Sequence, residues 1–139
     1  PDELVECVSM GVDLFDCALP TRVARHGGLF TLRGRVNIGS PRFRFESGPV
    51  EEGCDCLACL QFSASYIHHL YRSGELLALR LGSIHNLRFV LRLMGELRQA
   101  ILDGRFQEYR RNFLGSYIPT DQEARTEQKQ KWLARRFGS

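Results

Sequence analysis

The chain has 139 residues, which suits one ordinary domain and leaves little room for a second. Hydrophobic residues make up 43% and charged residues 25%, a balance typical of a globular protein that argues against a disordered tail. The net charge of +3 points to no partner by itself. No apolar run approaches the roughly 20 residues of a membrane-spanning helix, and no secretory leader is recognisable. We therefore expect a cytoplasmic protein. The start at Pro1, without a methionine, suggests a piece of something larger.

The first predicted elements are a helix over residues 2–10 and a short strand over 12–19. The helix has apolar residues at helical spacing and ends at Gly11. The strand is a mostly apolar run that Pro20 closes. A helix, a glycine and a short, largely apolar strand together are typical of one unit of an α/β barrel or a doubly wound sheet. Residues 21–28 have the composition of a loop.

A β-hairpin is predicted over residues 29–38, because Gly34 lies between two short apolar runs. The strict alternation of arginine and phenylalanine over 42–45 predicts another half-buried strand. From about residue 60 the apolar spacing becomes helical, and an amphipathic stripe covers residues 87–101. A further aromatic-faced helix follows from residue 106. In the polar tail, apolar side chains could pin the chain: Trp132, Leu133 and Phe137.

Charge is unevenly distributed along the chain. Residues 17–45 contain no acidic residue but six arginines: Arg22, Arg25, Arg33, Arg35, Arg42 and Arg44. Because the planar guanidinium group suits phosphate oxygens, this stretch is a candidate phosphate-facing surface. The alternative is a solvated basic face without a ligand, and charge alone does not decide between the two.

Three of the five cysteines form a Cys-x-Cys-x-x-Cys run at Cys54, Cys56 and Cys59. Three thiolates at this spacing can surround one tetrahedral Zn²⁺ ion. The fourth ligand must come from elsewhere, and His85 is the best candidate because it falls at the expected start of the amphipathic helix. We expect His68 and His69 to be packing or surface residues. Four protein ligands leave no open position, so the zinc is expected to be structural. The alternative is three reduced cysteines without a metal.

Asp16 is the candidate catalytic residue, because it lies near the C-terminal end of the predicted strand. In α/β barrels the chemistry takes place at that end of the strands. A carboxylate there can act as a nucleophile on a sugar carbon. The alternative is a turn or helix-capping carboxylate. Asp13 is expected to be structural, and Cys17 is expected to be buried on the opposite side of the strand.

Two groups of residues resemble the tRNA-guanine transglycosylase family. The first is GVDLFDCALPTR over residues 11–22, followed by residues 24–27, and it resembles the family signature. The second is the set Cys54, Cys56, Cys59 and His85, which resembles the zinc ligands in type, spacing and order. Residues 85–87 and 93–101 are similar to the family's terminal helices. The resemblance extends to about residue 115.

The family has a (β/α)₈ TIM-type barrel, so the resemblance implies an α/β fold in which this chain carries only the last barrel unit. Residues 1–28 would be the last barrel helix and strand with a tRNA-contacting loop. Residues 29–86 would be an inserted zinc-binding subdomain, and residues 87–139 would be C-terminal helices and a polar tail.

The resemblance also implies an activity. Asp16 would attack the ribose C1′ of the wobble guanosine of tRNA, and a 7-deazaguanine base would replace guanine, as in queuosine modification. Arg22 and Arg25 would contact the anticodon loop, one structural Zn²⁺ ion would be bound, and a homodimer is compatible with the family. Because the base-recognising residues would lie upstream, the isolated segment is expected to be inactive.

Two other functions are compatible with parts of the sequence. One is a non-catalytic, zinc-containing, tRNA-binding accessory subunit of a transglycosylase, and the presence of Asp16 favours the catalytic subunit over it. The other is a generic zinc-binding interaction domain, which does not account for the predicted strand and loop before the cysteines.

Overall fold

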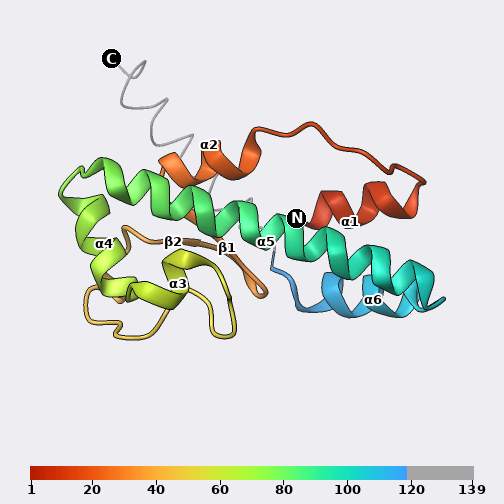
Figure 1. Cartoon of the computed structure of the whole chain (residues 1–139). Coiled ribbons are helices and arrows are strands. Elements are labelled where there is room, and N and C mark those ends of the chain that lie inside the picture. Colours follow the sequence, from red (N-terminus) through yellow and green to blue (C-terminus); the bar gives the residue numbers. More distant parts are fainter. Residues whose placement is uncertain (119–139) are drawn as a thin grey trace, which may run out of the picture.

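Helix α5 (Leu76–Leu102) is the spine of the structure, a computed structural model that describes residues 1–118. Its 27 residues give a rod of about 40 Å. The described part is dominated by helices and has one two-stranded sheet. The other elements pack around this rod (Figure 1), in chain order: α1 (Asp2–Ser9), α2 (Leu19–Arg25), β1 (Gly28–Thr31), β2 (Gly34–Asn37), a 3₁₀ turn (Pro41–Phe43), α3 (Leu57–Gln61), α4 (Ala64–Arg72) and α6 (Phe106–Ser116).

The N-terminal half of α5 packs against the hairpin, α3 and α4 around one hydrophobic core. The hairpin forms as predicted, with β1 antiparallel to β2 and Leu29 opposite Val36. Thr31 closes its turn by donating from its hydroxyl group to the Gly34 carbonyl oxygen at 2.7 Å. Fully buried side chains fill this first core, including Leu29, Ile38, Ile67 and Leu81.

The C-terminal half of α5 packs with α1 and α6 around a second core. Its buried residues include Val5 of α1, Leu93 and Leu97 of α5, and Phe113 of α6. Phe30 of β1 reaches this core and contacts Phe89, with ring centroids 5.8 Å apart. The helices predicted over 2–10 and from residue 106 are therefore confirmed, and each buries its apolar side here.

The strand predicted over residues 12–19 is not formed. Residues 12–18 have neither helix nor strand and are exposed, and α2 begins at Leu19. A strand requires a hydrogen-bonded neighbour, and the described chain offers none to this segment. Cys17 is consequently exposed, although it was expected to be buried. The loop expected over 21–28 is largely helical, because Pro20 stands in the first turn, where its fixed φ favours a helix start.

Two further expectations were wrong in detail. Residues 42–45 do not form a strand: Pro41–Phe43 is a 3₁₀ turn that buries Phe43 and leaves Phe45 86% exposed. The amphipathic helix begins at Leu76 and not near His85, because residues 76–81 are good helix formers that follow the turn at Gly74. The tail residues Trp132, Leu133 and Phe137 lie outside the described residues. No described helix is both long and apolar enough to cross a membrane.

Candidate metal centre and basic surface

The three clustered cysteines lie in the loop that leads into α3. Cys56 is the N-cap residue of α3, and its sulfur accepts a hydrogen bond from the Cys59 amide at 3.3 Å. Cys54 and Cys56 are buried, and Cys59 is half-buried. This capping geometry turns all three sulfurs toward α5, where His85 is only 1% exposed.

The geometry of the cluster fits a tetrahedral metal ion. The Sγ atoms of Cys54, Cys56 and Cys59 lie 3.7, 3.6 and 3.3 Å from Nδ1 of His85. All four ligand atoms lie within 4.8 Å of one another. Around Zn²⁺, with bonds of about 2.3 Å to sulfur and about 2.0 Å to nitrogen, the tetrahedral edge from sulfur to nitrogen is about 3.5 Å. The cluster can therefore hold one metal ion, and its donors suit zinc.

Backbone contacts fix the orientation of His85. Its Nε2 atom lies 2.7 Å from the Phe30 carbonyl oxygen, which can only accept a hydrogen bond. Nε2 therefore carries the proton, and the lone pair of Nδ1 faces the three sulfurs. The hairpin thus sets the tautomer that metal binding requires. Asn86 is fully buried beside it, and its Oδ1 accepts from the Phe30 amide at 2.9 Å.

The electrostatics of the four side chains favour a thiolate at Cys56. A hydrogen bond from Cys59 lowers the pKa of Cys56 to about 3, and the same bond raises the pKa of Cys59. Burial opposes the charged form of His85, but hydrogen bonds to Cys54 and Cys56 outweigh it and raise the pKa of His85 to about 10. A bound cation replaces the shared protons, so binding releases them.

Two polar contacts attach the cysteine loop to its surroundings. Arg88 of α5 forms a two-pronged ion pair with Asp55, at 2.7 and 2.6 Å. This contact is exposed, so solvent and salt weaken it. Glu51 accepts a hydrogen bond from the Leu32 amide at 2.8 Å and so links the loop to the hairpin turn. Burial raises the pKa of Glu51, against the lowering effect of that bond.

The predicted catalytic and tRNA-binding residues lie apart from the described core. Asp16 is exposed in segment 12–18 and has no hydrogen bond or ion pair among residues 1–118. Arg22 and Arg25 are exposed on α2. Of the other histidines, His68 is buried and its Nδ1 atom bonds the Ile38 carbonyl oxygen at 2.7 Å, as befits a packing residue.

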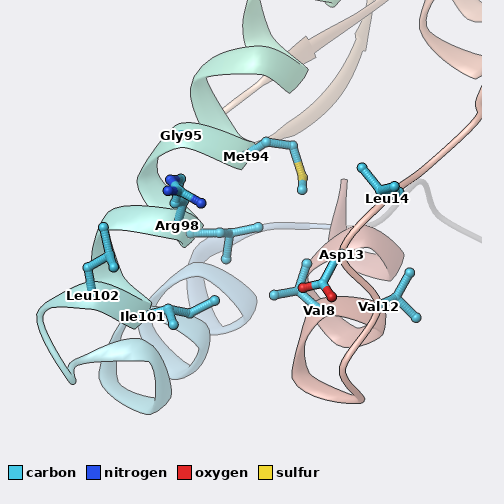
Figure 2. A pocket seen from close by; sticks show the side chains of 10 residues that line it. Val8, Val12, Asp13, Leu14, Met94, Gly95, Arg98, Ile101 and Leu102 are labelled. Carbon is cyan, nitrogen blue, oxygen red and sulfur yellow. The ribbon is translucent and has the colours of Figure 1, made fainter.

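An apolar groove of about 580 Å³ lies between α1 with the following residues 12–14 and the C-terminal half of α5. Figure 2 shows the side chains of Met94 and Ile101 pointing into the space that Val8 and Asp13 face from the other side. This groove leaves apolar surface of both α1 and α5 uncovered.

Sequence reasoning missed Asn86 and Tyr71. The Asn86 amide nitrogen donates to the carbonyl oxygens of Pro20 and Gly28 at 3.0 and 2.9 Å, and the Tyr71 hydroxyl donates to the Ala24 carbonyl oxygen. Both residues thereby attach α2 to the core. The available signal for Asn86 was its spacing, three and seven residues before Phe89 and Leu93, which places a polar residue on the apolar side of the helix.

Together these features define a helical domain built around a Cys₃His metal centre, preceded by an exposed acidic segment and a basic helix. The sequence profile described as queuine tRNA-ribosyltransferase matches residues 1–119. The chain belongs to this family.

Individual relatives agree with that assignment. The chain is 50% identical over 138 residues to the queuine tRNA-ribosyltransferase of Dehalococcoides mccartyi, covering 99% of this chain and 35% of that protein. It is 46% identical over 132 residues to the queuine tRNA-ribosyltransferase of Dictyoglomus turgidum, covering 95% of this chain and 34% of that protein. For Thiobacillus denitrificans the identity is 50% over 109 residues, covering 78% and 30%. The chain therefore spans about a third of the length of the curated relatives it matches.

Proposed function

We propose that the protein carrying this chain is a tRNA-guanine transglycosylase that replaces the wobble guanine of tRNA with a 7-deazaguanine base. The observation that carries the proposal is the family match over residues 1–119, a stretch that includes Asp16 and the cluster of three cysteines and one histidine. The named relatives are queuine tRNA-ribosyltransferases, and this supports a pentosyltransferase acting on tRNA.

In this proposal Asp16 is the nucleophile. Its carboxylate oxygen attacks the ribose C1′ as the bond from C1′ to guanine N9 breaks, which leaves tRNA covalently attached to the enzyme. The departing guanine takes up a proton at N9. The incoming base then attacks C1′ through its own ring nitrogen, loses the proton on that nitrogen and releases the Asp16 carboxylate. The exposure of Asp16 in segment 12–18 leaves its carboxylate free for such an attack. Arg22 and Arg25, exposed on the following helix, would contact the anticodon loop.

The metal has a structural role in this proposal. Cys54, Cys56, Cys59 and His85 would hold one Zn²⁺ ion, and four protein ligands leave no position for a substrate. Zinc would supply a cross-link between the cysteine loop and α5. The Phe30 carbonyl oxygen would keep the His85 ring in its binding orientation.

The architecture proposed for the whole protein is a TIM-type barrel whose last unit is residues 1–28. Segment 12–18 would be the last barrel strand, hydrogen-bonded to strands contributed from upstream. The apolar groove beside α1 would pack against that barrel. The zinc subdomain over 29–86 and the C-terminal part over 87–139 complete the proposed division. We further propose a cytoplasmic location and allow for a homodimer.

The test is exchange of labelled guanine into unmodified tRNA by the full-length protein that carries this sequence. Asp16→Asn should lower the exchange rate by at least about 10³-fold, the scale on which removal of a nucleophile acts. It should also abolish the covalent tRNA adduct that a denaturing gel is expected to show for the parent. Asp13→Asn changes a neighbouring carboxylate in the same segment and should retain the adduct.

Metal content and circular dichroism establish that each variant is folded. Exchange by the parent and none by Asp16→Asn supports the proposal. A folded, metal-loaded parent that exchanges no guanine contradicts it and points to a binding-only accessory subunit. The 139-residue segment by itself should show no exchange, since the proposed base pocket lies upstream.

A further inference from the structure

A basic pocket of about 450 Å³ lies between α2 and β2. Its polar lining comes from both elements and consists of Arg22, His26, Arg35 and Asn37. The apolar side chains of Val23 and Val36 form part of its walls. No carboxylate lines it. Neither of its two arginine side chains forms an ion pair within residues 1–118, so their positive charges are not neutralised by the described part of the chain.

The hairpin register brings Arg35 to this pocket. Arg35 stands opposite Phe30 on β2, and its side chain is exposed while that of Phe30 is buried. The stem of Arg35 crosses directly over Gly28, where a Cβ atom would lie only 3.3 Å from its Cδ. The absence of a side chain at Gly28 therefore lets the Arg35 stem lie close against the backbone next to α2.

Arg22 and His26 are four residues apart, one turn of α2, and so lie on one face. Nδ1 of His26 lies 2.9 Å from the Arg22 carbonyl oxygen, so this nitrogen carries the proton and donates. Nε2 is left for a ligand. Asn37 uses its Oδ1 on the Gly39 amide, which leaves its NH₂ group as another donor.

The chemistry of this pocket suits a phosphate group. Two guanidinium groups from different elements can contact different oxygens of one phosphate, and Arg geometry matches such oxygens. The apolar side chains of Val23 and Val36 suit an attached sugar better than a fully hydrated free ion. The pocket also shares Arg22 with the surface proposed to bind tRNA, so one nucleic-acid chain could contact both.

We propose that this pocket holds one backbone phosphate of RNA between Arg22 of α2 and Arg35 of β2, which makes Arg35 a further substrate-binding residue. The inference rests on the proposed function, because the RNA is taken to be the tRNA substrate. Asn37 supplies additional hydrogen bonds to the same phosphate through its NH₂ group.

The experiment measures the affinity of the full-length, metal-loaded protein for unmodified tRNA over a series of KCl concentrations. Each phosphate contact contributes about 0.7–0.9 to the slope of log K against log salt. Arg35→Gln keeps most of the aliphatic stem over Gly28 and should reduce the magnitude of the slope by about 1. The affinity itself should fall by about three- to tenfold at the lowest salt. Arg35→Lys should retain most of the slope because it retains the charge.

The matched control is Arg111→Gln, which removes the same charge from an exposed position on α6, where Arg111 has no ion pair in the described part of the chain. Its slope should equal that of the parent. An unchanged slope in Arg35→Gln overturns the inference, and so does an equal loss in Arg111→Gln, which would indicate an effect of overall charge. Inorganic phosphate bound at the pocket, detected by shifts of the His26 ring resonances, with an unchanged tRNA slope also overturns the assignment to RNA.

The guanine-exchange assay separates this inference from the proposed function. If the parent exchanges guanine and Arg35→Gln binds tRNA as the parent does, only the phosphate inference is overturned. If the parent exchanges no guanine and the salt slope of tRNA binding is reduced only in Arg35→Gln, the phosphate inference is supported and the enzymatic proposal is overturned.

Discussion

His85 and Asn86 are adjacent in α5, and together they bind both backbone groups of Phe30. His85 donates to the Phe30 carbonyl oxygen, and Asn86 accepts from the Phe30 amide. Asn86 also donates to the Gly28 carbonyl oxygen. These side chains satisfy the edge of β1 that faces away from β2, where unpaired backbone groups would otherwise be buried. The metal ligand and the support of the hairpin are thus neighbouring residues of one helix.

Asn86→Asp tests this arrangement with an almost isosteric change. The carboxylate keeps an acceptor for the Phe30 amide but loses the donors to Pro20 and Gly28, and it buries a charge. We expect the free energy of unfolding to fall by about 3–5 kcal/mol, measured by urea denaturation at saturating zinc. Asn112→Asp, at an exposed position of α6, should change stability by less than about 0.5 kcal/mol. A loss below about 1 kcal/mol at Asn86 would show that these bonds contribute little.

At the scale of elements, the sequence predicted correctly those features whose signals lie close together in the chain. The hairpin was predictable because Gly34 and its flanking apolar runs are adjacent in sequence, and the four metal ligands were predictable from their types and order. The conformation of segment 12–18 was not predictable, because a strand depends on partners that its own residues do not specify. The basic pocket between α2 and β2 was not predictable either, because the hairpin register decides that Arg35 and Arg22 line the same pocket.

The two glycines inside α5 provide a matched pair at this scale. A Cβ atom at Gly82 would collide with the Tyr71 hydroxyl group and would lie 3.1 Å from Leu29 Cδ2. A Cβ atom at Gly95 would have no neighbouring atom within 4 Å. Alanine is favoured over glycine in a helix by about 1 kcal/mol. In the 139-residue chain, Gly95→Ala should therefore raise the melting temperature, and Gly82→Ala should lower it despite the same propensity gain. Equal stabilisation by both would indicate that α2 and α4 move freely against α5.

At the scale of the whole molecule, the two cores depend on the metal to different extents. The first core includes Cys54 and Cys56 themselves, and the loop before α3 has no helix or strand to hold it. The second core is formed by α1, α6, half of α5 and Phe30 of β1, and it contains no metal ligand. A metal that cross-links the cysteine loop to α5 should therefore stabilise the first core far more than the second.

Removal of the metal by a chelator should show this difference directly in hydrogen exchange. We expect amides of the hairpin and α3 to exchange at least about 100-fold faster, which corresponds to about 2.7 kcal/mol of local stability, while those of α6 change by less than about tenfold. Cys59→Ser should reproduce the effect without chelator. Cys17→Ser removes an exposed thiol outside the cluster and should behave like the parent. Equal acceleration in α6 would mean that the two cores unfold as one unit, so that the metal stabilises the whole chain through α5.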